Sequence, residues 1–146
     1  MKPAACGVAL QRRPPLMLEL ALETLRREGL AFIDLPPCGA EQCAWVRAVA
    51  ECLKRGQCSR AVIFCGETDV AGCVTNKIPG VRAATVTGVA QAERAILGLG
   101  ANVLIVDPAD RTFFEFKEIL RLGAADVACP PGVAFVLQEL DGHAHR

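Results

Sequence analysis

Short apolar runs that alternate with amphipathic segments constrain the fold of this chain more than any other feature. The run RAVIFC at 60–65 is apolar at every position after its arginine, which is typical of a strand buried on both faces of a sheet. Three further runs have strand character: LAFIDL at 30–35, VRAATV at 81–86 and NVLIVD at 102–107. We interpret the N-terminal segment, residues 1–15, as containing the first strand.

The segments between these runs have apolar residues at the spacing of a helix face. Leu18, Leu22 and Leu25 follow this spacing between Pro14–Pro15 and Gly29, which would end the helix. Alternating strands and helices predict an α/β fold: a three-layer, Rossmann-like domain with a parallel sheet of about five strands and helices on both faces. The other predicted helices cover 40–54, 74–77, 89–97 and 111–122.

The chain has 146 residues, which fits a single domain spanning 1–146. Its last part, 124–146, departs most from the strand–helix pattern. There CPPG at 129–132 breaks the chain, and VAFVLQEL at 133–140 predicts either a helical turn or an added strand. We therefore treat 124–146 as a divergent C-terminal tail.

Charge and hydropathy exclude several function classes. Lys and Arg number 16 and Asp and Glu also number 16, without long runs of either sign, so no nucleic-acid partner is expected. No apolar stretch approaches the roughly 20 residues of a membrane-spanning helix.

Gln11-Arg12-Arg13 interrupts the apolar patch near the N-terminus, which argues against a secretion signal and favours a cytoplasmic location. Arg12 and Arg13 could meet a phosphate there, although a solvated turn is the more common role of such a pair.

The eight cysteines lie in apolar segments and form no CxxC pair, and both histidines fall within the last four residues. This pattern does not match the ligand spacing of structural zinc sites, so no metal is expected. In a reducing compartment most of these cysteines would be small buried side chains.

Cys65 is the candidate reactive group because ligands bind at the carboxyl ends of strands in open parallel sheets. Cys65–Gly66, Asp107–Pro108 and Thr85–Thr87 each follow a predicted strand and should share one rim. A thiol near a helix N-terminus could have a lowered pKa and act as a proton-transfer base. The residues alone favour the simpler interpretation, in which Cys65 ends a buried strand. A flavodoxin-like binding or signalling domain also fits the strand–helix pattern, but its phosphorylatable aspartate is replaced by Cys65.

Four segments carry a resemblance to a known family. They are REGLAFIDL at 27–35, Cys65–Gly66 after its strand, NKIPGVRAA at 76–84 and ANVL at 101–104. With these segments in order, the chain from about residue 16 to 122 resembles the ribose-5-phosphate isomerase type B family, which includes the galactose-6-phosphate isomerase subunits. The resemblance implies an aldose–ketose isomerase without metal or organic cofactor, which acts on a sugar phosphate at a site between two subunits.

The resemblance also implies roles for individual residues. Cys65 would be the catalytic base that moves a proton between C1 and C2 of an open-chain sugar phosphate through an enediolate. Backbone amides of the following loop would hold that anion, as backbone donors do in oxyanion sites. Apart from the resemblance, Asn76 could orient the loop or a phosphate, and a cap at a helix end is an equally good interpretation of it. The residues predicted to bind substrate are Gly66, Glu67, Thr68, Asp69, Val70, Ala71 and Asn76.

Several positions depart from the family pattern. Thr68 and Val70 replace glycines of the loop, Glu67 and Asp69 add carboxylates where negative charge must develop, and the ring-opening histidine aligns with Gly98. We therefore expect weak or altered isomerase activity in a homodimer or tetramer. The alternative is a homologue without catalysis, which serves as a partner subunit in a heteromer with a homologous chain or as a ligand-binding module.

Overall fold

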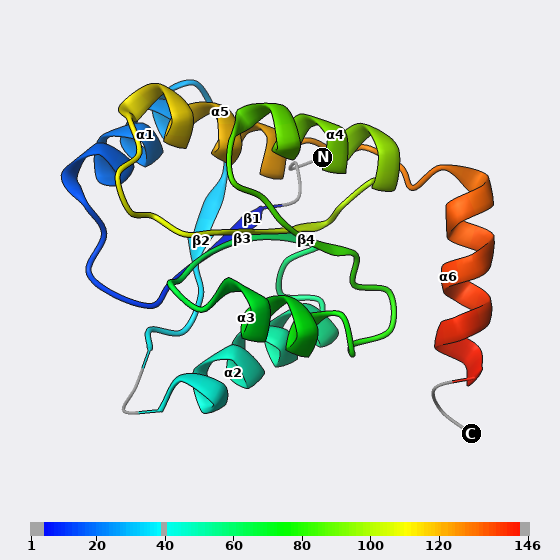
Figure 1. Ribbon diagram of the computed structural model, residues 1–146. Coiled ribbons are helices and arrows are strands. Elements are labelled where there is room, and N and C mark those ends of the chain that lie inside the picture. The colour runs from blue at the N-terminus through cyan, green and yellow to red at the C-terminus, as the bar shows by residue number, and fades with distance from the viewer. Residues whose placement is uncertain (1–4, 39–40, 144–146) are drawn as a thin grey trace.

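The predicted apolar runs form one parallel sheet in the computed structural model, which describes residues 5–38 and 41–143 (Figure 1). The strand order is β2-β1-β3-β5-β4, and the predicted three-layer α/β fold is confirmed. The strands are β1 (Cys6–Leu10), β2 (Phe32–Asp34), β3 (Arg60–Phe64), β4 (Ala83–Thr85) and β5 (Val103–Val106). The helices are α1 (Leu16–Arg27), α2 (Gln42–Lys54), α3 (Thr68–Thr75), α4 (Val89–Leu99), α5 (Phe113–Gly123) and α6 (Pro131–His143).

Helices cover both faces of this sheet. Figure 1 shows α1, α4 and α5 above the sheet, α2 and α3 below it, and α6 beside these layers. Helices α1 and α4 pack against α5, and α2 packs against α3. Covering on both faces suits β3, which is buried along its whole length, as its continuous apolar sequence predicts. None of the helices in the described part of the chain is long and apolar enough to cross a membrane.

The register of the sheet brings three strand ends together. Leu10 of β1 pairs with Phe64 of β3, and Phe64 in turn pairs with Val106 of β5. The segments that follow these three residues therefore leave the sheet side by side. Cys65, the first residue after β3, lies in the middle of this edge.

Successive residues of β3 face opposite layers. Val62 and Phe64 belong to the core beneath α1, α4 and α5, where the ring of Phe64 meets that of Phe116 edge-on at a centroid distance of 5.9 Å. Ile63 and Cys65 belong to the second core, on the α2 and α3 side. This alternation follows from the period of a strand, in which neighbouring side chains point to opposite faces.

Helix α3 begins earlier than predicted. The sequence predicted a loop after Cys65 and a helix only over 74–77, whereas the structure forms a helix over Thr68–Thr75. Ala71 and Thr75 lie one turn apart and are buried, and the Thr75 hydroxyl donates to the Ala71 carbonyl at 2.7 Å. Burial of this face stabilises helical structure that local propensity alone does not.

The tail also forms a helix rather than an added strand. Helix α6 begins at Pro131, and proline is favoured at the first position of a helix because its missing N–H has no helical partner to lose. The segment before α6 is held by Arg60, whose guanidinium donates to Asp126 Oδ1 at 3.0 Å and to the Val127 carbonyl at 3.2 Å. These contacts anchor the start of the tail at the amino end of β3.

Candidate functional site

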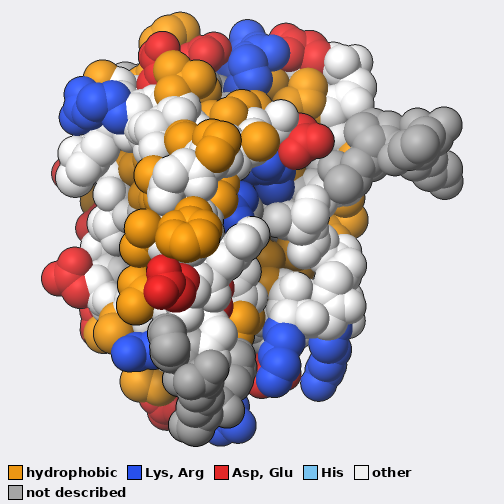
Figure 2. Space-filling model, turned by 90° about the vertical axis from the view of Figure 1, so that its right-hand side faces the viewer, with side chains coloured by type: hydrophobic (Ala, Val, Ile, Leu, Met, Phe, Trp, Pro, Cys, Tyr) orange, Lys and Arg blue, Asp and Glu red, His pale blue; other side chains and the backbone are white. Residues whose placement is uncertain are grey.

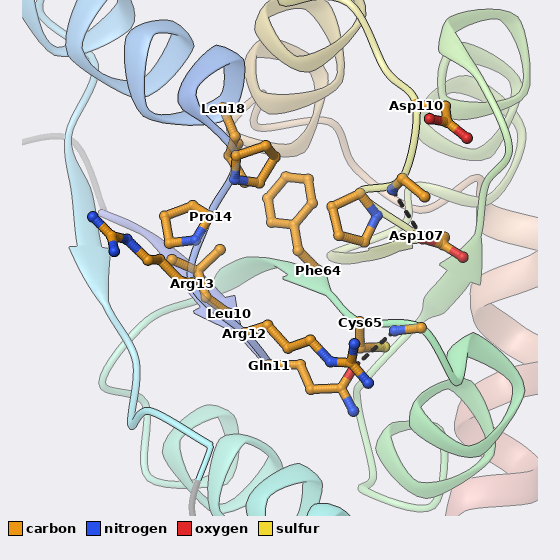
Figure 3. A pocket seen from close by; sticks show the side chains of 14 residues that line it. Leu10, Gln11, Arg12, Arg13, Pro14, Leu18, Phe64, Cys65, Asp107 and Asp110 are labelled. Atoms are coloured by element: carbon orange, nitrogen blue, oxygen red, sulfur yellow. Dashed lines mark hydrogen bonds between the residues drawn. The ribbon is translucent and has the colours of Figure 1, made fainter.

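A cavity of about 430 Å³ opens at the carboxyl ends of β1, β3 and β5 (Figure 3). Leu10, Leu18 and Phe64 supply apolar surface, and polar groups come from the segments that follow the three strands. The volume falls within the about 300–1,000 Å³ of small-molecule sites. The polar and charged residues that line the cavity are Gln11, Arg12, Arg13, Cys65, Gly66, Asp107 and Asp110.

Cys65 lies where β3 meets this cavity. It is 1% exposed, and its N–H donates to the Val106 carbonyl at 3.1 Å. Burial, followed by the negative charges of Asp107 and Glu67, raises the pKa of the thiol to about 11, while a hydrogen bond with the Glu67 backbone acts in the opposite direction. The thiol is therefore protonated at neutral pH. The lowered pKa that the sequence suggested for this thiol is wrong. Burial raises the pKa of Cys65 by more than the following helix lowers it.

The backbone amide of Gly66 already has a hydrogen-bond partner. Its N–H donates to the side-chain Oε1 of Gln11 at 2.8 Å, which Figure 3 shows as a dashed line. Gln11 is itself tied to the sheet, because its own N–H donates to the Phe64 carbonyl at 3.0 Å. Among the residues predicted to bind substrate, Gly66 is the one that lines this cavity.

Glu67 and Asp69 do not line the cavity. Both residues are exposed. The carboxylate of Glu67 faces the side-chain amide of Gln42, whose nitrogen, in the orientation that satisfies both groups, lies 3.0 Å from Glu67 Oε2. The acidic side chains that do line the cavity are Asp107 and Asp110.

The other predicted loop residues form the first turn of α3. Thr68, Asp69 and Val70 begin the helix, and the first N–H groups of a helix have no intrahelical partner. The N–H of Ala71 donates to the Glu67 carbonyl at 3.3 Å, which closes the first helical hydrogen bond. None of these helical residues lines the cavity, and their roles in substrate binding stay predictions.

Asn76 directly follows the C-terminal end of α3, whereas the residues that line the cavity, Cys65 and Gly66, precede the N-terminal end of this helix. Its Nδ2 donates to the Ala83 carbonyl at 3.0 Å, and the Ala83 N–H donates to its Oδ1 at 2.8 Å. Asn76 also lines a second cavity, of about 450 Å³, between the β4 region and α6. Its predicted contact with substrate stays a prediction as well.

Asp107 is a further functional candidate. The sequence predicted its position on the rim formed by the strand ends, but no chemical role for it. It directly follows β5, and its charge acts on Cys65. Its Oδ1 accepts the Ala109 N–H at 3.0 Å, and its carbonyl accepts Arg111 Nε at 2.6 Å. Thr87, predicted on the same rim, does not line the cavity. The signal for Asp107 is its position one residue after a strand that pairs with β3.

The two arginines after β1 lie differently. Figure 3 shows the side chain of Arg12 extending toward Cys65 and Gln11, whereas Arg13 turns away from them. Both residues line the cavity and both are exposed. Arg12 therefore brings a positive charge to the side of the cavity where Cys65 lies.

Metal-ligating side chains do not gather in the described residues. Across 5–38 and 41–143, no three His, Cys, Asp or Glu side chains form a group that could hold a metal ion. The cavity instead offers charged side chains at its rim, apolar walls and the thiol of Cys65. This lining suits a small polar ligand that is bound by hydrogen bonds and charge.

Comparisons with known proteins agree with this geometry. The family model described as ribose/galactose isomerase matches residues 17–119. The fold is similar to that of ribose-5-phosphate isomerase B from Clostridium thermocellum, at 21% identity over 97% of each chain and a TM-score of 0.76. It is also similar to ribose-5-phosphate isomerase B from Mycoplasma genitalium with bound ribulose-5-phosphate, at 19% identity over 97% of each chain and a TM-score of 0.78. The type B ribose 5-phosphate isomerase of Trypanosoma cruzi matches at 20% identity, over 97% of this chain and 99% of the other, with a TM-score of 0.73. No curated protein sequence matches the chain significantly.

Proposed function

Because the chain belongs to the ribose/galactose isomerase family, we propose that it binds a sugar phosphate in the cavity of Figure 3 and slowly interconverts its aldose and ketose forms. The observation that carries this proposal is the position of Cys65–Gly66, which directly follows the central strand β3 and lines the cavity. Ligands of open parallel sheets bind at this place, outside the carboxyl ends of the strands.

In the proposed reaction, the Cys65 thiolate takes the proton from C2 of the open-chain aldose. The C–H electron pair forms the C1–C2 double bond, and the carbonyl electrons pass to O1, which gives an enediolate. Cys65 then returns the proton to C1, and the hydroxyl proton of O2 passes to O1, which completes the ketose. The backbone amides of residues 66–71 are proposed to stabilise the enediolate as oxyanion donors, with Asn76 holding the far end of α3.

The environment of Cys65 makes this reaction slow. With a thiol pKa of about 11, only about one thiol in 10⁴ is ionised at pH 7. Asp107 and Glu67 oppose the formation of a second negative charge beside them. The position that aligns with a ring-opening histidine is Gly98, which has no side chain to move a proton.

The test is a turnover assay of the full chain with ribose 5-phosphate and galactose 6-phosphate. We expect slow turnover that disappears in Cys65→Ala and persists in Cys73→Ala, a matched control because Cys73 is an exposed thiol of α3 outside the cavity. Unchanged turnover in Cys65→Ala would show that Cys65 is not the base. Absence of turnover in the unmodified chain would favour the alternative function, a partner subunit or ligand-binding module.

We further propose that two copies of the chain associate through α6. Phe135, Val136 and Leu140 on this helix are 68%, 52% and 59% exposed. Figure 2 views the side of the molecule on which α6 lies and shows apolar side chains gathered there. Exposed apolar surface of this kind is typical of protein interaction sites, and α6 stands beside the layers where a second copy could reach it (Figure 1).

Light scattering coupled to size-exclusion chromatography tests this assembly. We expect a dimer, or a tetramer built from dimers, that dissociates in the double variant Phe135→Ser, Leu140→Ser and is retained in Glu139→Ser, a control at an exposed polar position of the same helix. A monomeric unmodified chain would contradict self-association. Association only after addition of a homologous chain would support the heteromer.

We also propose a cytoplasmic location. Support comes from the thiols of Cys6, Cys52 and Cys58, which are buried and free in the structure. Free thiols persist in reducing compartments and are paired more often in oxidising ones. Fluorescence microscopy of the tagged full chain would test the location.

A further inference from the structure

Arg111, between β5 and α5, lies at a junction of three segments. Its Nε donates to the Asp107 carbonyl at 2.6 Å, and its Nη1 donates to the Thr87 carbonyl at 2.8 Å. The same Nη1 lies 3.4 Å from Glu115 Oε2, and the arginine side chain is only 10% exposed. A guanidinium carries five N–H donors in a rigid plane, so one side chain can bind several segments at once. Arg111 therefore joins the segments that follow β4 and β5 to the start of α5.

The partners of Arg111 are themselves held at the starts of two helices. The Thr87 N–H and hydroxyl both donate to the side-chain oxygen of Gln91 in α4, at 2.7 Å and 2.8 Å. Glu115 forms a capping box with Thr112 at the start of α5. A capping box fixes the first turn of a helix, because it satisfies two backbone donors reciprocally. The bond from Arg111 to the Asp107 carbonyl therefore ties the end of β5 to two anchored helix starts.

The turn between Asp107 and Arg111 makes this contact possible. Asp107 Oδ1 accepts the Ala109 N–H at 3.0 Å, a bond that Figure 3 shows as a dashed line. Asp110 has a φ of 56°, in the left-handed region that aspartate adopts more readily than most other residues with a side chain. The chain thus turns back on itself within four residues, and the guanidinium of Arg111 returns to the carbonyl of Asp107.

Asp107 and Cys65 occupy matching places at the ends of neighbouring strands. The Cys65 N–H donates to the carbonyl of Val106, the residue before Asp107, at 3.1 Å. Both Cys65 and Asp107 line the cavity, as does Asp110. The charges of Asp107 and Glu67 raise the pKa of the thiol, and Arg12 extends toward it from the β1 side (Figure 3). The charge of Arg111 is not among the causes of this shift, so an influence of Arg111 on Cys65 has to pass through Asp107.

We propose that Arg111 is a positioning residue that fixes the carboxylate of Asp107 beside Cys65 by joining the segments after β4 and β5. Without Arg111 the turn at 107–110 loosens, and the carboxylate spends more time in solvent, farther from the thiol. Its electrostatic effect on Cys65 then weakens, because the interaction of two charges falls with distance and with the surrounding dielectric constant. The inference rests on the proposed function only in taking Cys65 as the reactive group.

Alkylation of the full chain with iodoacetamide at pH 8 tests this role, with each modified cysteine quantified by mass spectrometry. The reagent attacks the thiolate, so its rate reports the ionised fraction of Cys65. We expect Arg111→Gln to accelerate alkylation of Cys65 by about threefold to tenfold, since a decrease of one unit in the pKa gives ten times more thiolate. Arg111→Lys should act in the same direction, because an ammonium group lacks the planar fork of donors.

Three controls separate positioning from a general loss of structure. Arg121→Gln removes an arginine of α5 that pairs with Glu28 and Glu118, and should change the rate at Cys65 less than about twofold. Alkylation of Cys52, a buried free thiol, should stay as slow as in the unmodified chain. In the Asp107→Asn background, Arg111→Gln should add less than about twofold, because the charge that it positions is already absent.

Several outcomes would overturn the role of Arg111. They are an unchanged or slower alkylation of Cys65 in Arg111→Gln, an unmodified rate in Arg111→Lys, an equal acceleration at Cys52, or the full acceleration in the Asp107→Asn background. Alkylation needs no substrate, so it separates this inference from the proposed function. The expected alkylation pattern without any turnover of ribose 5-phosphate would contradict the isomerase function and leave the role of Arg111 intact. Turnover that depends on Cys65, with alkylation unaffected by Arg111→Gln, would contradict the role of Arg111 alone.

Discussion

Gly66 donates its backbone N–H to the side-chain carbonyl of Gln11 at 2.8 Å, which links the ends of β1 and β3 at the edge where Cys65 lies. In the proposed reaction this amide would contact the developing enediolate. The uncharged side-chain oxygen of Gln11 therefore already accepts the Gly66 N–H, a donor that the reaction could use. The contact gives a physical reason for slow chemistry that is independent of the pKa of Cys65.

Removing this contact should increase the rate. We expect Gln11→Ala to raise kcat for ribose 5-phosphate by about fivefold to tenfold, because a freed amide can stabilise the enediolate at the cost of a neutral hydrogen bond. Steady-state kinetics measure the effect, with Gln57→Ala, in the exposed turn after α2, as the control. A lower kcat would mean that Gln11 itself assists the substrate.

The rate should also rise with pH. The thiol of Cys65 has a pKa of about 11, so the reactive thiolate fraction grows about tenfold per pH unit below that value. We expect kcat/KM to increase by about two orders of magnitude between pH 7 and pH 9, measured over a range in which circular dichroism shows the fold intact. A flat profile would indicate that a group other than Cys65 takes the proton.

Neutralising Asp107 should shift this profile toward lower pH. Its negative charge is the largest cause of the raised pKa of Cys65 after burial. We expect Asp107→Asn to lower the pKa of Cys65 and so to increase kcat/KM at pH 8. Asp110→Asn is the matched control, because Asp110 lines the same cavity and is not among the causes of the shift. A profile unchanged by Asp107→Asn would place its charge too far from the thiol to act.

The buried thiol of Cys6 should make the free energy of unfolding decrease as the pH rises above 8. Burial, and then the charge of Cys58, raises the pKa of this thiol from 9.0 to about 12. The folded state therefore holds the proton more tightly than the unfolded state, so this stability is present below pH 9 and is lost as pH rises toward 12. We expect Cys6 to account for a decrease in the free energy of unfolding of about 1.4 kcal/mol between pH 8 and pH 10. Urea unfolding should show a smaller decrease in Cys6→Ala than in Cys73→Ala.

Two glycines of the helices should respond to alanine in opposite ways. A Cβ at Gly123, the last residue of α5, would lie 2.4 Å from Val62 Cγ2, whereas a Cβ at Gly98 in α4 meets nothing within 4 Å. We expect Gly123→Ala to lower the free energy of unfolding by about 1–3 kcal/mol through overpacking. Gly98→Ala should raise it by up to about 1 kcal/mol, because alanine is the better helix former. Denaturant titration of both variants measures these changes, and stabilisation by Gly123→Ala would contradict the close packing of α5 on β3.

The fold was predictable because its signals are local. A continuous apolar run such as 60–65 is buried on both faces wherever it lies in a parallel sheet, and helix periodicity identifies the covering layers. One exception is α3, whose start at Thr68 depends on burial of Ala71 and Thr75 against the rest of the protein. The sequence predicted a loop at this place, and tertiary packing overrides that expectation.

The sequence by itself determined the strands, most of the helices and the place of Cys65–Gly66 at the end of a central strand. Only the tertiary structure decided which side chains face the cavity, because strand order and register join segments that are distant in the chain. They bring Gln11 and Asp107 to Cys65 and leave Glu67 outside the cavity. The state of the thiol was decided in the same way, since burial and the charge of Asp107, on a neighbouring strand end, keep Cys65 protonated.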